Sequence, residues 1–187
     1  FARNSGETEI TTEDGIEVFQ EEKYYLLKKN VEILSDDLEL NGQVVKIYFE
    51  NDLYDIKELI ANDDVTFISD KFNIEGKGDT VQFNIKNQNI IVNGINSELY
   101  LENTKMFSDG IISVDNLKGL FFIEGQNSSL ISDNIYITGS KINGSFEIIN
   151  GKRDIAYLIV EDNKKLNIKT NDIEMFSKKA VYNKEKS

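Results

Sequence analysis

Apolar and polar residues alternate with a period of two through most of this chain. Clear examples of this alternation are residues 38–40, 72–74, 81–85, 135–137 and 166–168. Because successive side chains of a strand point to opposite faces of a sheet, the pattern predicts strands with one buried and one solvated face. Asn, Asp and Gly separate the strands, as at residues 86–89 and 93–94, and such residues favour tight hairpins. The sequence therefore predicts an all-β fold of many short antiparallel strands.

A short phrase recurs along the chain and indicates one structural unit used several times. The phrase reads as a polar turn, then apolar, polar, apolar and polar positions, and then Gly. It occurs as SDDLELNG at 35–42, SDKFNIEG at 69–76 and SDNIYITG at 132–139, with a weaker copy, NTKMFSDG, at 103–110. The four copies start 34, 34 and 29 residues apart. A period of this size is typical of stacked units, whose terminal members are expected to differ from the others.

Helical signals are weak. Residues 50–62 have some apolar residues at helical spacing, but residues 55–62 fall where the other units have a strand, so we predict a strand there. Residues 171–181 are the other helix candidate. We expect a single domain over residues 7–170 and a C-terminal extension or tail over residues 171–187.

Composition narrows the range of functions. The chain has 187 residues, and its 33 acidic and 21 basic side chains give a net charge of −12, which argues against a nucleic-acid partner. It contains no His and no Cys, so His- or Cys-dependent nucleophiles and the usual zinc sites cannot be built. We therefore expect no enzyme, no metal and no cofactor. The first residue is Phe1 rather than Met, so we expect that a signal peptide or membrane anchor has been removed.

The order of these segments resembles the OstA-type domain, the building block of the lipopolysaccharide-transport proteins LptA and LptC and of the periplasmic part of LptD. The residues that carry the resemblance are 16–19, 30–33, 35–42, 62–67, 69–76, 79–84 and 89–94. It covers approximately residues 7–170.

The resemblance implies a fold and a function. The implied fold is a twisted antiparallel β-jellyroll of two facing sheets that is open at both ends and has an apolar interior. The implied function is non-enzymatic: a carrier or bridge component in the periplasm that holds the acyl chains of lipid A between the sheets during transport to the outer membrane. Implied partners are lipopolysaccharide, further copies of this chain, and the OstA-like domains of LptC and LptD.

The apolar positions of the alternation form the first candidate site. If the two sheets separate, these residues line a slot for lipid; if they close, the same residues make a dry core about 10 Å thick. The sequence leaves both possibilities open. The interior-facing candidates are Ile33, Leu38, Leu40, Ile47, Phe49, Phe67, Phe72, Ile74, Val81, Phe83, Ile85, Ile135 and Ile137.

Terminal strands form the second candidate site, because unpaired strand edges invite the addition of a further strand. The candidates for edge association are Ile10, Ile16 and Val18 at one end and Leu166 and Ile168 at the other.

Carboxylate pairs are a third possibility. The pairs Asp36–Asp37 and Asp63–Asp64 lie at predicted turns and lack the loop spacing of a calcium site, so we interpret them as solvated turns.

Three alternatives stay open. One is an LptC-like, membrane-anchored member of the same pathway. Another is a structural β-scaffold with a dry interior. The third, which the surface position of the acids disfavours, is a carboxylate-dependent glycan hydrolase.

Overall fold

The computed structural model describes residues 6–53, 55–133, 135–149 and 152–184. Within these residues the chain forms fourteen β-strands, and all their pairings are antiparallel. The strands are β1 (Glu9–Thr11), β2 (Ile16–Phe19), β3 (Tyr24–Leu34), β4 (Glu39–Phe49), β5 (Ile56–Ser69), β6 (Ile74–Asn84), β7 (Asn89–Asn93), β8 (Ser97–Leu101), β9 (Thr104–Ser108), β10 (Ile111–Asp115), β11 (Leu120–Ser132), β12 (Ile135–Ile149), β13 (Lys152–Lys169) and β14 (Glu174–Asn183). The all-β, antiparallel prediction is confirmed.

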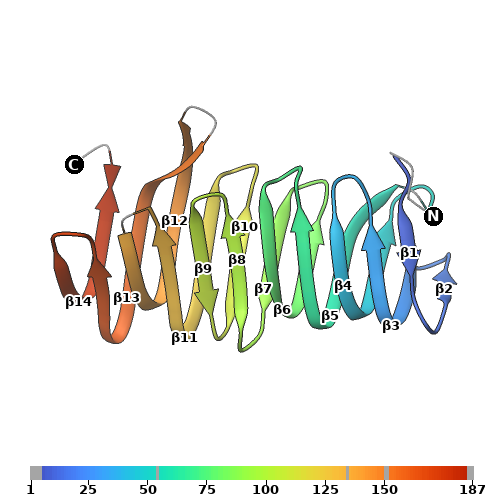
Figure 1. The fold of residues 1–187 in the computed structure, drawn as a ribbon, viewed down its shortest axis with the longest axis horizontal. Helices are drawn as coiled ribbons and strands as arrows, with labels where there is room; N and C mark the ends of the chain where they lie inside the picture. Colours follow the sequence, from blue (N-terminus) through green and yellow to red (C-terminus); the bar gives the residue numbers. More distant parts are fainter. Residues whose placement is uncertain (1–5, 54, 134, 150–151, 185–187) are drawn as a thin grey trace.

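The long strands bend in the middle, and each half joins a different layer. β6 shows the arrangement: residues 74–77 pair with β8, whereas residues 80–84 pair with β7. We call layer A the ladder that runs through β1, β8 and β9, and layer B the ladder that runs through β2, β7 and β10. The register shifts where β3, β4, β5, β11, β12 and β13 cross between the layers. Figure 1 shows the resulting elongated stack, with the N-terminal strands at one end and β14 at the other.

Left-handed backbone conformations occur at two of these bends. In β3, Lys29 and Asn30 have φ of 67° and 50°, and in β5, Asp63 and Asp64 have φ of 64° and 53°. Asn and Asp tolerate this region better than most residues, because their short polar side chains can bond locally. The pair Asp63–Asp64, interpreted from the sequence as a solvated turn, thus lies at a strand bend.

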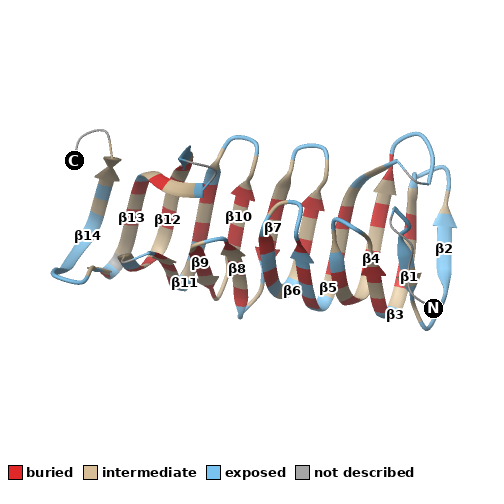
Figure 2. Ribbon diagram, turned by 45° about the horizontal axis from the view of Figure 1, so that its top comes forward, coloured by how far each residue is buried: buried red, intermediate tan, exposed pale blue. Residues whose placement is uncertain are grey.

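The hydrophobic core lies between the two layers. One cluster of buried side chains runs through both layers, and red bands mark these residues along the strands in Figure 2. In the centre of the stack Leu99, Met106 and Ile112 are completely buried. β2 and β14 contain no buried residue, which is consistent with their place at the ends.

The repeated phrase corresponds to a layer A hairpin and the strand half that follows it. In one full repeat the chain leaves layer A along one bent strand, turns in layer B, and returns to layer A along the next bent strand. The Gly of the phrase faces the interior near the bend. A Cβ on Gly76 would lie 2.7 Å from the Phe67 ring, and one on Gly139 would lie 2.7 Å from Val160 Cγ1. At these two copies the glycine is therefore required for close packing at the corner between the layers, whereas a Cβ on Gly42 would come no nearer than 3.5 Å to its neighbours.

The C-terminal segment differs from what the sequence predicts. Residues 171–181 are a helix candidate from the sequence and residues 171–187 are expected to be an extension or a tail, but β14 spans Glu174–Asn183 and pairs with β13 along both of its halves, so the segment extends the sheet. The prediction of a strand over residues 55–62 is confirmed by β5.

Candidate apolar site at the C-terminal end

An apolar cavity of about 650 Å³ lies between β12, β13 and β14 at the C-terminal end of the stack. This volume falls within the usual range of small-molecule sites, about 300–1,000 Å³. Most of the cavity wall is aliphatic. The lining residues are Ile135, Ile137, Ile155, Leu158, Val160, Leu166, Ile168, Thr170, Met175, Phe176, Ser177, Lys179, Ala180, Val181 and Tyr182.

Strand register explains why β14 faces this cavity. Residues directly opposite each other in an antiparallel ladder share a face. Met175 lies opposite Ile168, and Tyr182 lies opposite Leu158, so the inner face of β13 continues onto β14. No further strand covers β14 within the described residues, because the strand order ends there. The inner face of β14 is therefore half exposed, as the 50% exposure of Met175 indicates.

Charged groups lie at the rim of the cavity. The Lys179 ammonium lies 2.7 Å from the carboxylate of Glu161 and joins β14 to β13. The hydrogen bond from Lys179 lowers the pKa of Glu161 below its ordinary value, and the same contact raises the pKa of Lys179. Lys165 lies 3.7 Å from the centre of the Phe176 ring. The rim thus carries a lysine–carboxylate pair and a lysine over an aromatic ring, whereas the wall is aliphatic.

The interior candidates from the sequence all lie in or against the core. Nine of them are buried, and Leu38, Phe72, Ile85 and Ile135 are partly buried and pack against the cluster. Ile135 and Ile137 line the cavity. Phe72 of layer A and Phe83 of layer B are in edge-to-face contact, with ring centres 5.7 Å apart. Towards the N-terminal half the two sheets are therefore in direct contact, and lipid contact at these candidates stays a prediction.

The edge candidates divide into two groups. Ile16 and Val18 lie in β2 opposite Leu27 and Tyr25, so they face the interior at the N-terminal end, and they are 52% and 47% exposed. Ile10 of β1 packs against the core.

The expectation that Leu166 and Ile168 form the opposite edge is wrong. β13 is paired with β12 on one side and with β14 on the other, and Leu166 is completely buried. β14 is the terminal strand instead.

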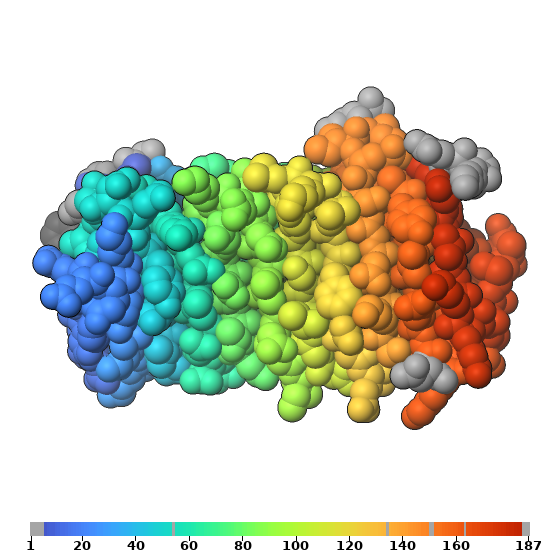
Figure 3. Space-filling view, turned by 180° about the vertical axis from the view of Figure 1, so that it is seen from behind, coloured from blue at the N-terminus to red at the C-terminus, as the bar shows by residue number. Residues whose placement is uncertain are grey.

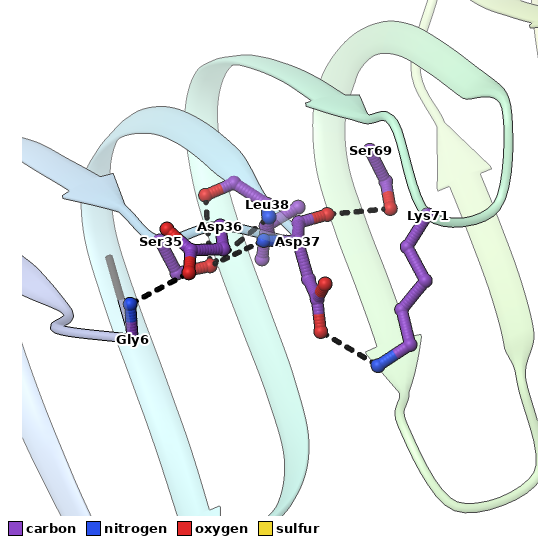
Figure 4. Close-up of polar contacts among 7 residues, drawn as sticks. All are labelled: Gly6, Ser35, Asp36, Asp37, Leu38, Ser69 and Lys71. Carbon is purple, nitrogen blue, oxygen red and sulfur yellow. Dashed lines mark hydrogen bonds and ion pairs between the residues drawn. The ribbon is translucent and has the colours of Figure 1, made fainter.

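The turns of layer A are linked from one repeat to the next (Figure 4). The Ser69 hydroxyl donates to the carbonyl of Asp37 at 2.7 Å, and Lys71 pairs with the Asp37 carboxylate at 2.6 Å. Asp36 accepts a hydrogen bond from the backbone of Gly6. Among the described residues no group of three or more acids is arranged to hold a metal ion. The Asp36–Asp37 pair thus stabilises the stack at its turns.

Known proteins resemble this chain in structure but not in sequence. No protein-family model matches the chain, and no curated protein matches it. The chain is similar in structure to LptH. That protein is described as the LptA-homologous periplasmic component of the lipopolysaccharide transport device of Pseudomonas aeruginosa. The two chains are 12% identical with a TM-score of 0.49, and the match covers 59% of this chain and 76% of LptH. The described residues contain no helix that is long and apolar enough to cross a membrane.

Sequence reasoning missed the residues that β14 contributes to the cavity. Met175, Ala180 and Tyr182 face inwards, but the bend between Ser177 and Lys179 shifts the alternation by one residue. Phe176 and Val181 add exposed apolar side chains to the same strand. In the sequence Met175 and Phe176 are adjacent, as are Ala180, Val181 and Tyr182, so neither half of β14 shows the period-two alternation that marks the other strands.

Proposed function

We propose that this protein is a non-enzymatic, periplasmic lipid-binding protein that takes acyl chains of lipopolysaccharide into its apolar interior as a carrier or bridge component. The observation that carries the proposal is the aliphatic cavity at the C-terminal end, which shares Ile137, Leu158 and Val160 with the packed core. The resemblance of the sequence to OstA-type domains makes lipopolysaccharide the first ligand to test.

The chemistry of the interior supports an acyl chain rather than a polar ligand. Each CH₂ group moved from water to an apolar site contributes about 0.8 kcal/mol, so several buried segments of chain give substantial affinity. Among the described residues the buried polar side chains are Ser69, Ser97, Thr104, Ser108, Ser128 and Ser132. None of these six carries a charge. An acyl chain therefore meets no unpaired charge inside, while a charged headgroup can stay at the rim near Lys179.

Site-specific photo-crosslinking tests the proposal. A photoreactive phenylalanine analogue is placed at Met175, on the inner face of β14, and the matched control is the same analogue at Ile159. Ile159 lies on the outer face of β13, opposite Asn143 and Val181, and adjoins the cavity residues in sequence. We expect adducts with purified lipopolysaccharide at Met175 and at least tenfold fewer at Ile159.

Deacylated lipopolysaccharide distinguishes chain binding from headgroup binding. We expect it neither to form the Met175 adduct nor to compete for it, whereas intact lipopolysaccharide raises the unfolding temperature of the protein. Equal adduct yields at Met175 and Ile159, or no adduct at either, contradict the proposal and favour a dry scaffold.

End-to-end association is a second candidate function, favoured by the unpaired strands at the two ends. Among the residues that the structure describes, β1 and β2 each pair only with β3, and β14 pairs only with β13. Ile16 and Val18 face inwards at one end and Met175 faces inwards at the other, so stacking of two copies joins their apolar interiors. Such stacking is the proposed route of contact with further copies or with the OstA-like domains of LptC and LptD.

Single cysteines test this association cleanly because the chain has none of its own. An Ile16→Cys protein is mixed with a Met175→Cys protein under mild oxidation. We expect a disulfide-linked dimer mainly from the mixture and a mass that grows with concentration in light scattering. Dimers that form equally well from each variant alone, or a strict monomer, exclude head-to-tail stacking.

A further inference from the structure

The hairpin of β12 and β13 extends past the rim of the stack. Figure 1 shows it rising above the neighbouring hairpins, and Figure 3 shows the same projection from behind, in orange. A register shift between Ser145 and Phe146 lies at its base. There the Phe146 amide donates to the carbonyl of Gly119 at 2.7 Å. The base of the hairpin is thereby fixed to the β10–β11 turn.

Arg153, near the start of β13, connects this hairpin to turns of both layers. Arg153 lies opposite Ile148, two residues before the inward-facing Ile155, so its side chain belongs to the inner face of layer B. Its guanidinium donates to the carbonyl of Phe72 at 3.1 Å and pairs with the carboxylate of Glu102 at 3.3 Å. Both partners belong to turns of layer A. A further bond goes to the side chain of Asn116, in the β10–β11 turn of layer B.

Low solvent exposure and a second bond to Glu102 hold Arg153 in these contacts. Its side chain is only 14% exposed, and Glu102 also accepts from the Arg153 backbone amide at 3.1 Å. Guanidinium bonds to carboxylate are charge-assisted and hold a defined geometry. On the other face of the hairpin, the Lys184 ammonium contacts the carboxylates of Glu147 and Asp154. The hairpin is therefore held from both sides.

We propose that Arg153 is a positioning residue that keeps the lateral edge between the two sheets closed, so that acyl chains enter the interior from the C-terminal end. The inference rests on the proposed function. Phe72 is bonded through its carbonyl to Arg153, and its ring packs against Phe83 of the opposite layer. Without the Arg153 contacts, the edges of the two sheets can separate at the Phe72–Phe83 ring pair, and a lipid then reaches Phe83 from the side.

Crosslinking from two positions tests the route of entry. The photoreactive analogue is placed at Phe83 or at Met175, each combined with Arg153→Ala, Arg153→Lys or Lys184→Ala. For Arg153→Ala we expect lipopolysaccharide adducts at Phe83 to rise at least fivefold, with the Met175 yield changed less than twofold. Arg153→Lys restores part of the closure, because an ammonium still reaches Glu102 but cannot serve all three acceptors. Lys184→Ala, which removes a contact on the other face of the same hairpin, leaves the Phe83 yield unchanged.

A covalent tie provides the converse test. Glu102→Cys and Arg153→Cys are combined and joined by a short bis-maleimide. Retention of the Met175 adduct after the tie supports entry from the end, and its loss overturns the proposal while leaving lipid binding itself intact.

Amide hydrogen exchange without lipid supplies an independent readout: faster exchange at Asn73 and Asn116 is expected in Arg153→Ala. Unchanged exchange together with an unchanged Phe83 yield also overturns the inference, whereas absence of the Met175 adduct in the unmodified protein counts against the proposed function.

Discussion

The centre of the stack and its C-terminal end use the same alternation of apolar and polar residues but differ in what covers them. In the centre Leu99, Met106 and Ile112 are completely buried between layers A and B. At the C-terminal end Met175, on the inner face of β14, is 50% exposed, and the inner faces of β12 to β14 surround a cavity. The sheet is regular in both regions, so strand formation alone does not decide whether the interior is filled.

The number of neighbouring strands explains the difference. Every strand half in the centre has a partner on both sides, and its inner face meets the opposite layer. Within the described residues β14 has one partner strand, and no further repeat follows it. In the centre the side chains of the next repeat fill the interior from the side. The last unit of a stack thus retains an apolar surface that a ligand or another copy can cover.

Truncation of a core side chain is expected to have the largest effect and to separate the two regions most clearly. Leu99→Ala leaves a cavity in the packed centre and should lower the free energy of unfolding by about 2–5 kcal/mol. Ile168→Ala only enlarges an existing cavity, because Ile168 is partly buried and already lines it. We expect a loss of less than half that of Leu99→Ala, as measured by urea unfolding followed by circular dichroism.

Equal losses in the two variants contradict the comparison and indicate that the C-terminal end is as tightly packed as the centre. The same pair also tests ligand binding. A saturating lipid should restore stability to Ile168→Ala more than to Leu99→Ala, since only the former lies at the cavity.

Enlargement of two alanines is expected to give the next largest difference. Ala61 of β5 is completely buried among packed side chains, whereas Ala180 of β14 is partly buried and lines the cavity. Ala61→Leu should destabilise by about 1–3 kcal/mol, because overpacking a filled core forces its neighbours out of position. Ala180→Leu should be neutral or stabilising and should reduce the lipopolysaccharide adduct at Met175. If Ala180→Leu destabilises the protein as much as Ala61→Leu does, the packing of the C-terminal end does not differ from that of the centre.

The regular part of this fold could be predicted from sequence because its signal is local. Strands such as β6 follow from alternation, and the repeated phrase marks successive layer A hairpins. The phrase shows that Gly76 recurs but not why: its missing side chain makes room for the Phe67 ring.

The C-terminal cavity and the Arg153 contacts could not be predicted in the same way because they depend on residues far apart in the sequence. The cavity exists because no strand of the described residues covers the inner face of β14. A local sequence pattern does not show that a neighbouring strand is absent. Arg153 bonds to Asn116 and Phe72, which lie 37 and 81 residues away in the sequence. Its neighbours Lys152 and Asp154 give it the appearance of an ordinary surface residue. β14 itself could not be found by alternation, because its apolar residues are adjacent to one another on both sides of Lys178.

The pH dependence of the pair Glu161–Lys179 is expected to give the smallest effect, confined to the open end. The bond to Lys179 lowers the folded pKa of Glu161 from its ordinary value of 4.5, so the pair stabilises β14 above pH 4.5, and this contribution is lost as the pH falls through the lowered value. The pKa of Lys179 is raised, so at the alkaline side the contribution is complete below 10.5 and is lost as the pH rises through the raised value. Both groups are exposed, so the effect is modest and salt weakens it.

Amide hydrogen exchange, corrected for intrinsic rates, measures this loss strand by strand. Between neutral pH and pH 3 we expect protection of β14 to fall more than that of β8 and β9, which lie in the packed centre. Glu161→Gln should remove this extra pH dependence and give β14 the same reduced protection at neutral pH that the unmodified protein has in acid. A parallel loss of protection in β14 and in the centre would mean that the two regions open together. The end strand would then be part of one cooperative unit, and the C-terminal cavity could not admit a lipid without loosening the core.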